Sequence, residues 1–187
     1  MEMRKMTIGA TVVVALAGSL LVGPATAAAA PYCGITWGST DKAGSGLPAP
    51  GAGTLTNVRA GRHDCYDRLV IDFSGPAARY SARYVPAVPH QAKSESLALR
   101  GGAAIEVVVR TSAYDLMTGA ATYTPDDPDE LVAVTGWSTL RQVAWGGSFE
   151  GYTTIGVGVR AHLPFQAFVL PGPGAGSRLV IDVAHRW

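Results

Sequence analysis

The chain repeats one short segment: Arg68-Leu69-Val70-Ile71-Asp72 returns unchanged as Arg178-Leu179-Val180-Ile181-Asp182. Each copy lies in a run rich in β-branched residues, which favours a strand. Because strand side chains alternate between two faces, one face of each copy is apolar: Leu69, Ile71 and Phe73 in the first, and Leu179, Ile181 and Val183 in the second. The arginine and aspartate that flank each copy favour a structural repeat over a chance match. We therefore expect one kind of strand to be used twice, in the same register, at the centre of one core.

The aspartates of the repeat occupy equivalent positions on the other face of their strands, together with the arginines. We expect Asp72 and Asp182 to be paired with Arg68 or Arg178, which gives these carboxylates a structural role.

Short strands separated by turns also account for the rest of the chain beyond residue 53. No segment shows a sustained period of 3.6, so we expect at most one short helix, placed at Asp126 to Leu131 with Pro128 in its first turn. This pattern predicts an all-β fold, a single-domain β-sandwich with internal pseudo-symmetry. The strand candidates are residues 54–60, 65–74, 78–85, 103–111, 131–137, 140–145, 152–161, 165–170 and 178–184.

The first thirty residues are typical of a signal peptide. Arg4 and Lys5 precede an apolar stretch from Thr7 to Gly23, and a run of small residues at 25–30 permits cleavage after Ala27, Ala28 or Ala29. The apolar stretch is shorter than the roughly 20 residues of a membrane span. We predict a signal peptide over residues 1–30, a secreted protein without a membrane span after cleavage, a flexible Gly/Ser/Pro-rich segment over 31–53 and the β domain over 54–187.

The charge of the mature chain is balanced. Removing residues 1–30 takes away Glu2, Arg4 and Lys5, so the fourteen acidic and fifteen basic residues become thirteen of each. A chain with no net charge has no basic field to gather nucleic acid or anionic lipid. We therefore expect no nucleic-acid partner.

The two cysteines, Cys33 and Cys65, predict a disulfide, because an exported protein meets an oxidising compartment. Their spacing matches no zinc or thioredoxin pattern. The bond would tie the start of the mature chain to the first copy of the repeated strand.

The sequence contains none of the common enzyme motifs: no G-x-S-x-G elbow, no H-E-x-x-H and no P-loop. Ser39 and Lys42 match S-x-x-K, but they lie in the Gly/Pro-rich segment and we interpret the match as coincidence. The acidic stretch at 126–130 resembles a calcium site only in charge and lacks the EF-hand spacing. We predict no catalytic residue, no metal ligand and no cofactor. The alternative is a secreted hydrolase that uses His63, Asp64, Asp67 and His185.

The aromatic residues are the remaining means of recognition, although most of them should be core. The candidate binding surface is Trp145, Phe149 and Tyr152, which would offer platforms for sugar rings or anchors for a partner. Nearby, Gly156 and Gly158 leave one face of their strand bare, which indicates that something presses on it. We expect an aromatic there, Trp145 or Trp137; a bound ligand is the alternative.

Three stretches of the chain resemble the AMIN-like domain of exported bacterial proteins: Val58 to Gly75, Leu140 to Gly151 and Arg178 to His185. The first and last are also similar to the AMIN domain proper, the module found beside cell-wall amidases and secretins. The resemblance implies a β-sandwich of two related sheets that places envelope proteins by contact with peptidoglycan or an associated polymer.

Together these observations predict a non-catalytic, monomeric module of the cell envelope, secreted and associated with the cell wall. Its expected partner is a cell-wall polymer or an envelope protein. Besides the hydrolase, an adaptor for a protein partner remains as an alternative.

Overall fold

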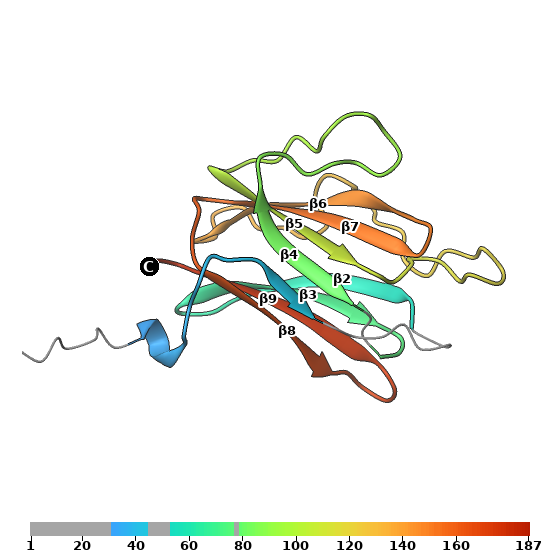
Figure 1. Ribbon diagram of the computed structural model, residues 1–187, viewed down its shortest axis with the longest axis horizontal. Helices are drawn as coiled ribbons and strands as arrows, with labels where there is room; N and C mark the ends of the chain where they lie inside the picture. The colour runs from blue at the N-terminus through green and yellow to red at the C-terminus, as the bar shows by residue number, and fades with distance from the viewer. Residues whose placement is uncertain (1–30, 45–52, 77–78) are drawn as a thin grey trace, which may run out of the picture. The chain divides into compact units, whose positions relative to one another are not determined.

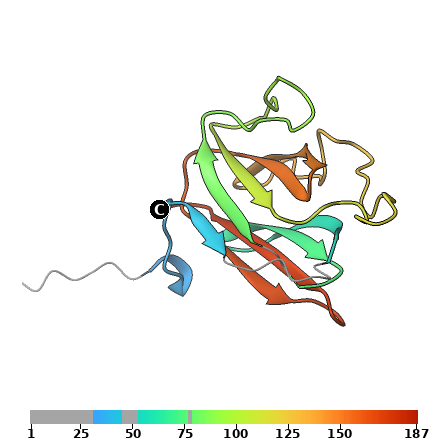
Figure 2. The same cartoon turned by 45° about the vertical axis from the view of Figure 1, so that its right-hand side comes forward.

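The computed structural model describes residues 31–44, 53–76 and 79–187, which form an all-β sandwich. Within these ranges, a five-stranded antiparallel sheet has the order β1-β4-β5-β7-β6 and a four-stranded one the order β2-β3-β9-β8. Figures 1 and 2 show the sheets as two layers, with β6 and β7 in one layer and β3 and β9 in the other. The strands are β1 (Lys42–Gly44), β2 (Leu55–Arg62), β3 (Tyr66–Phe73), β4 (Tyr80–Val85), β5 (Ala103–Val109), β6 (Leu140–Phe149), β7 (Tyr152–Val159), β8 (Phe165–Pro171) and β9 (Ser177–Ala184).

The repeated segments are neighbours at the centre of the four-stranded sheet, which confirms their expected use as central strands. β3 and β9 run antiparallel, and the middle residues of the two copies, Val70 and Val180, lie opposite each other. Leu69 therefore lies opposite Ile181, and Ile71 opposite Leu179. All four of these side chains are fully buried.

The core lies between the two sheets. The apolar face of the repeat belongs to one continuous cluster with the inward-facing residues of the five-stranded sheet, among them Ile105, Val107, Ile155 and Val157. Burial of this cluster is the main stabilising contribution, because apolar area removed from water contributes roughly 25 cal/mol per Å².

The outward face of the four-stranded sheet holds the charges of the repeat. The Arg68 guanidinium donates to both carboxylate oxygens of Asp182, with Nε–Oδ1 at 2.6 Å and Nη2–Oδ2 at 2.8 Å. The expected pairing of Asp182 is thus confirmed, but that of Asp72 is wrong. Asp72 pairs with Arg59 of the neighbouring strand β2 at 2.8 Å, whereas Arg178 turns to the carbonyl of Pro171.

The segment between residues 126 and 137 is neither the expected helix nor a strand. Its turns are held locally, with Asp127 accepting from the amide of Asp129. The segment then runs along the free edge of β6, where the amide of Leu131 donates to the carbonyl of Val143 at 2.8 Å. The six residues from Asp126 to Leu131 are too few to form a stable helix unaided. Their backbone groups instead hydrogen-bond to the exposed edge of the sheet.

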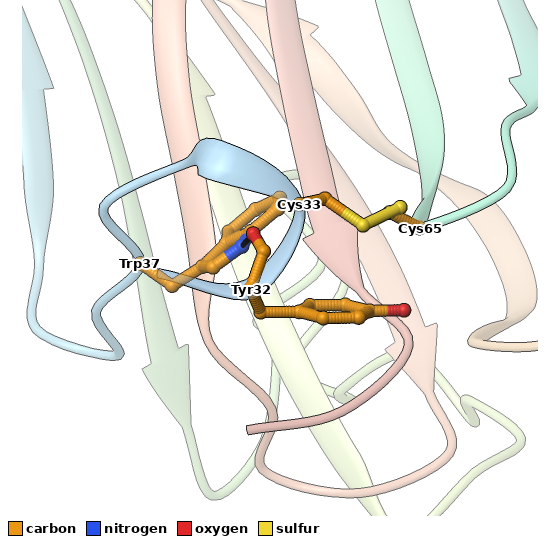
Figure 3. The surroundings of a disulfide bond; sticks show 4 residues. All are labelled: Tyr32, Cys33, Trp37 and Cys65. Carbon is orange, nitrogen blue, oxygen red and sulfur yellow. Dashed lines mark hydrogen bonds between the residues drawn. A yellow bond between two sulfur atoms is a disulfide. The ribbon is translucent and has the colours of Figure 1, made fainter. Parts of the chain in front are cut away.

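The N-terminal segment is attached to the sandwich at two places. Strand β1 lies inside the range 31–53 that the sequence marks as flexible, and it pairs with β4. The expected disulfide between Cys33 and Cys65 is confirmed, and Figure 3 shows it beside Tyr32 and Trp37. The predicted signal peptide and residues 45–52 lie outside the described residues. No helix in the described part of the chain is long and apolar enough to cross a membrane.

Reduction of the Cys33–Cys65 bond is expected to lower the melting temperature and leave the far-UV β spectrum in place. The bond closes a loop of 32 residues, which in the chain-entropy model stabilises the fold by roughly 3 kcal/mol. Only β1 and β2 lie within that loop, so most strands form without it. Thermal melts of oxidised and reduced protein followed by circular dichroism measure the effect. The variant Cys33→Ser/Cys65→Ser should melt like the reduced protein, and an unchanged melting temperature on reduction would contradict the expectation.

Candidate functional site

Two of the three predicted surface residues stand together on the exposed face of the five-stranded sheet. Phe149 and Tyr152 are cross-strand partners at the ends of β6 and β7, and they are 62% and 42% exposed. Glu150 and Gly151 join them with φ angles of 49° and 79°. A two-residue turn with both φ positive matches the right-handed twist of a hairpin. The turn therefore places the two residues next to each other on one face.

The third predicted residue lies apart from this pair. Trp145 is opposite Ile155, which places it on the inward face of the sheet, and its ring is 5.6 Å from that of Tyr123 at an angle of 53°. It is half-buried at the margin of the core. The structure brings Phe149 and Tyr152 together and does not bring Trp145 to the same surface.

The outward face of the same sheet carries a row of four large side chains, one from each of four neighbouring chain segments. Val109 is opposite Thr153 in the antiparallel pair of β5 and β7. The residue after Val109, Arg110, therefore lies beside the residue before Thr153, Tyr152. Arg110 in turn lies beside Arg79, since the amide of Arg110 donates to the Arg79 carbonyl at 2.8 Å. We call Arg79, Arg110, Tyr152 and Phe149 the end row.

Sequence reasoning missed the two arginines of the end row. They follow or precede strands that were correctly placed, but each stands isolated in the sequence among apolar and small residues. Only the register of β4, β5 and β7 brings them next to Tyr152. Their alternation with the inward-facing Tyr80 and Val109 is the one signal in the sequence that places them on the outward face.

A groove of about 440 Å³ lies against the end row. Its floor consists of small or apolar side chains of the next row inward, from Ala43, Ser81 and Val108. Tyr80 also lines the groove, although its side chain points inward, where its hydroxyl donates to the Ala167 carbonyl at 2.9 Å and burial raises its pKa. The charges that line the groove are the guanidinium groups of Arg79 and Arg110.

A loop covers the middle of the same outward face. The side-chain nitrogen of Gln91 donates to the Thr154 hydroxyl at 2.8 Å, and the backbone amide of Gln91 donates to the Gly146 carbonyl at 2.7 Å. Further along, the loop presses on the bare glycines: a Cβ at Gly156 would meet Leu97, and one at Gly158 would meet the carbonyl oxygen of Arg100. The expected aromatic contact at these glycines is wrong, because the loop between β4 and β5, drawn green in Figure 1, fills that place. None of the residues of this loop lines the groove beside the end row.

The three remaining tryptophans do not join the end row. Trp37 is half-buried, with its indole nitrogen donating to the Tyr32 carbonyl at 2.8 Å. Trp137 packs against the core. Trp187 is 69% exposed, and its indole nitrogen donates to the His162 carbonyl. Trp187 therefore offers a single exposed ring without an aromatic neighbour of the kind that Phe149 has in Tyr152.

Asp67 and His185, two of the four residues of the alternative hydrolase, have structural roles. Asp67 is fully buried, and one of its oxygens accepts from the amides of Thr139 and Leu140 at 2.6 and 3.0 Å. The other oxygen lies 3.1 Å from His185, so Asp67 joins β3 to the start of β6 and the end of β9. His63 stacks on Tyr66 at 4.5 Å. Asp64 is exposed.

Metal-ligating side chains do not gather in the part of the chain that the structure describes. No group of three or more His, Cys, Asp or Glu residues there has the geometry to hold an ion. In the acidic stretch at 126–130, Glu130 pairs with Arg100 and Asp127 caps its own turn.

The family model described as the AMIN-like domain matches residues 53–185. The match takes in both copies of the repeat, both sheets from β2 onward and the whole end row. No curated protein is matched by the chain.

Proposed function

This chain belongs to the AMIN-like domain family, and on that premise we propose that it is a non-catalytic, secreted module that binds peptidoglycan or a polymer attached to it. The family and the Cys33–Cys65 disulfide indicate an extracytoplasmic location, because disulfides persist in oxidising compartments. The ligand is a cell-wall polymer, and the role of the protein is to bind it without catalysing a reaction. The protein is a monomer associated with the cell wall.

The observation that carries the proposal is the exposed pair of rings at Phe149 and Tyr152. A two-residue hairpin turn fixes the backbone positions of both residues, so little backbone freedom of the protein is lost when a ligand binds there. The two exposed aromatic residues are neighbours across the hairpin, and the apolar faces of their rings suit the apolar faces of pyranose rings. The open groove beside them gives a polymer chain room to continue.

Support for a non-catalytic role comes from the residues that acid–base chemistry would need. Both carboxylate oxygens of Asp67 form hydrogen bonds within the fold, and one of these contacts holds His185. The end row contains no carboxylate, histidine or hydroxyl nucleophile other than the phenol of Tyr152. Arginine and aromatic side chains can bind a ligand, but they supply no general acid or base at neutral pH.

Co-sedimentation with intact bacterial sacculi tests the proposal. The mature chain should appear in the pellet at low and moderate salt, and protein that stays wholly in the supernatant under both conditions would refute polymer binding. The variant Phe149→Ala/Tyr152→Ala should weaken binding by about fivefold or more, the effect of losing anchors worth more than 1 kcal/mol. The matched control is Trp187→Ala, which removes an exposed ring away from the end row and should bind as the parent does.

A further inference from the structure

Arg79 and Arg110 form an unbalanced pair of positive charges. They stand directly opposite each other on neighbouring chain segments, a position in which like charges destabilise a sheet. Neither has a carboxylate partner among the residues that the structure describes. The nearest arginine on the same face is different, because Arg83 pairs with Glu106 at 2.7 Å.

The contact that Arg110 does make leaves its charge in place. Its guanidinium carbon lies 5.9 Å from the centre of the Tyr152 ring, which orients the side chain along the end row without neutralising it. Residues that break a local rule of stability are expected at functional sites. Two adjacent, unneutralised guanidinium groups beside a groove with a small, neutral floor are suited to receive an anion.

We propose that the end row selects an acidic ligand: Arg79 and Arg110 bind a free carboxylate on the peptide stem of peptidoglycan, while Tyr152 and Phe149 contact the adjoining sugar. The inference rests on the proposed function and adds the chemistry of the ligand. The planar guanidinium fork matches the two oxygens of a carboxylate. Neighbouring strands are about 5 Å apart, so the bound acid must lie next to a ring. A muramyl peptide carries a sugar ring and free stem carboxylates within one short unit, whereas a polyol phosphate has the anion but no ring for the two aromatics.

Sacculi with chemically altered anions test this inference. Sacculi are first stripped of covalently attached secondary polymers by mild acid, and half of the stripped material is then amidated with carbodiimide and methylamine, which converts its free carboxylates to neutral amides. The mature chain should bind stripped sacculi as it binds intact ones, and amidation should weaken its binding at least about tenfold. Raising the salt concentration should weaken binding to unamidated sacculi and have little effect on what remains after amidation.

A charge-matched pair of variants assigns the effect to the end row. Arg79→Gln/Arg110→Gln should lose at least about tenfold in affinity for stripped sacculi and should no longer distinguish amidated from unamidated material. Arg62→Gln/Arg186→Gln removes the same charge at two other exposed arginines and should behave as the parent. Neither variant should melt below the parent, because none of these four guanidinium groups forms an ion pair within the described ranges; Arg79→Gln/Arg110→Gln should melt at the parental temperature or slightly above it, since it removes two like charges that stand opposite each other.

Each other outcome has a definite meaning. Equal binding to amidated and unamidated sacculi would overturn the carboxylate inference and leave polymer binding standing. Loss of binding on stripping would assign the anion to a secondary polymer and overturn the choice of peptidoglycan. Equal losses in the two arginine variants would show a nonspecific charge effect and overturn the assignment to the end row. No binding to any sacculi would refute the proposed function itself.

Discussion

Ile181→Ala is expected to lower the free energy of unfolding by about 2–5 kcal/mol, and Ile71→Ala by a similar amount. Both side chains are fully buried in the cluster shared by the two sheets. Each comes from one copy of the repeat, and the two strands pair directly. Truncation leaves a cavity that two well-hydrogen-bonded central strands cannot close by moving.

Urea unfolding followed by intrinsic fluorescence measures these losses. Val169→Ala is the matched control, because Val169 lies on the neighbouring strand β8 and is 43% exposed; its truncation should cost less than about 1 kcal/mol. A loss of that small size at either isoleucine would mean that the two copies are not equivalent core strands.

Asp182→Asn is expected to destabilise the fold by about 3 kcal/mol, whereas Asp72→Asn should cost at most about 1 kcal/mol. Asp182 is fully buried and accepts three hydrogen bonds, two from Arg68 and one from Gln166. Removing one partner of a buried ion pair typically costs roughly 3–5 kcal/mol, because the other charge stays without a counterion. The side chain of Arg68 is 25% exposed, so solvent reduces the penalty to the lower end of that range.

The equivalent aspartate of the first copy has a different environment. The side chain of Asp72 is 21% exposed and that of its partner Arg59 is 47% exposed. Exposed ion pairs of this kind contribute about 0–1 kcal/mol. The same urea experiment on both variants compares two identical substitutions at equivalent positions of the repeat. Equal losses would mean that burial does not set the strength of these two ion pairs.

The strands and the core were predictable because both follow from periodicity. Leu69, Ile71, Leu179 and Ile181 alternate with polar residues, and that alternation alone determines which face is buried. The pairing of the two copies with each other was not predictable, since the alternation is the same whichever strand is the neighbour. For the same reason Asp72 was assigned to the wrong arginine: its actual partner, Arg59, is on β2.

The region from 126 to 137 shows where local pattern fails. Val134 is buried and Pro128 suits a helical turn, so the segment satisfies local preferences for both elements. Its structure is decided by the free edge of β6, to which Leu131 donates. That edge is formed by residues later in the chain. A preference of a few tenths of a kcal/mol per residue is readily overridden by such tertiary contacts.

The candidate site was only partly predictable. The exposure of Phe149 and Tyr152 follows from their places beside a tight Glu-Gly turn, where a strand leaves the core. Trp145 follows the inward alternation of Val143, and its size alone does not indicate a surface role. The arginines of the end row become a pair only through strand register. Likewise, the residues covering Gly156 come from a loop about sixty residues earlier in the chain, too far for any local pattern to reveal.

The most direct test of the proposed binding face is an NMR titration of the isotope-labelled mature chain with soluble peptidoglycan fragments. We expect the largest amide shift changes along the end row and its groove, at residues 79–81, 108–110 and 149–153, with little change on the outward face of the four-stranded sheet. Changes confined to that other sheet, around Arg59, Asp72 and Arg178, would contradict the proposal, because they would place the ligand on the opposite side of the sandwich.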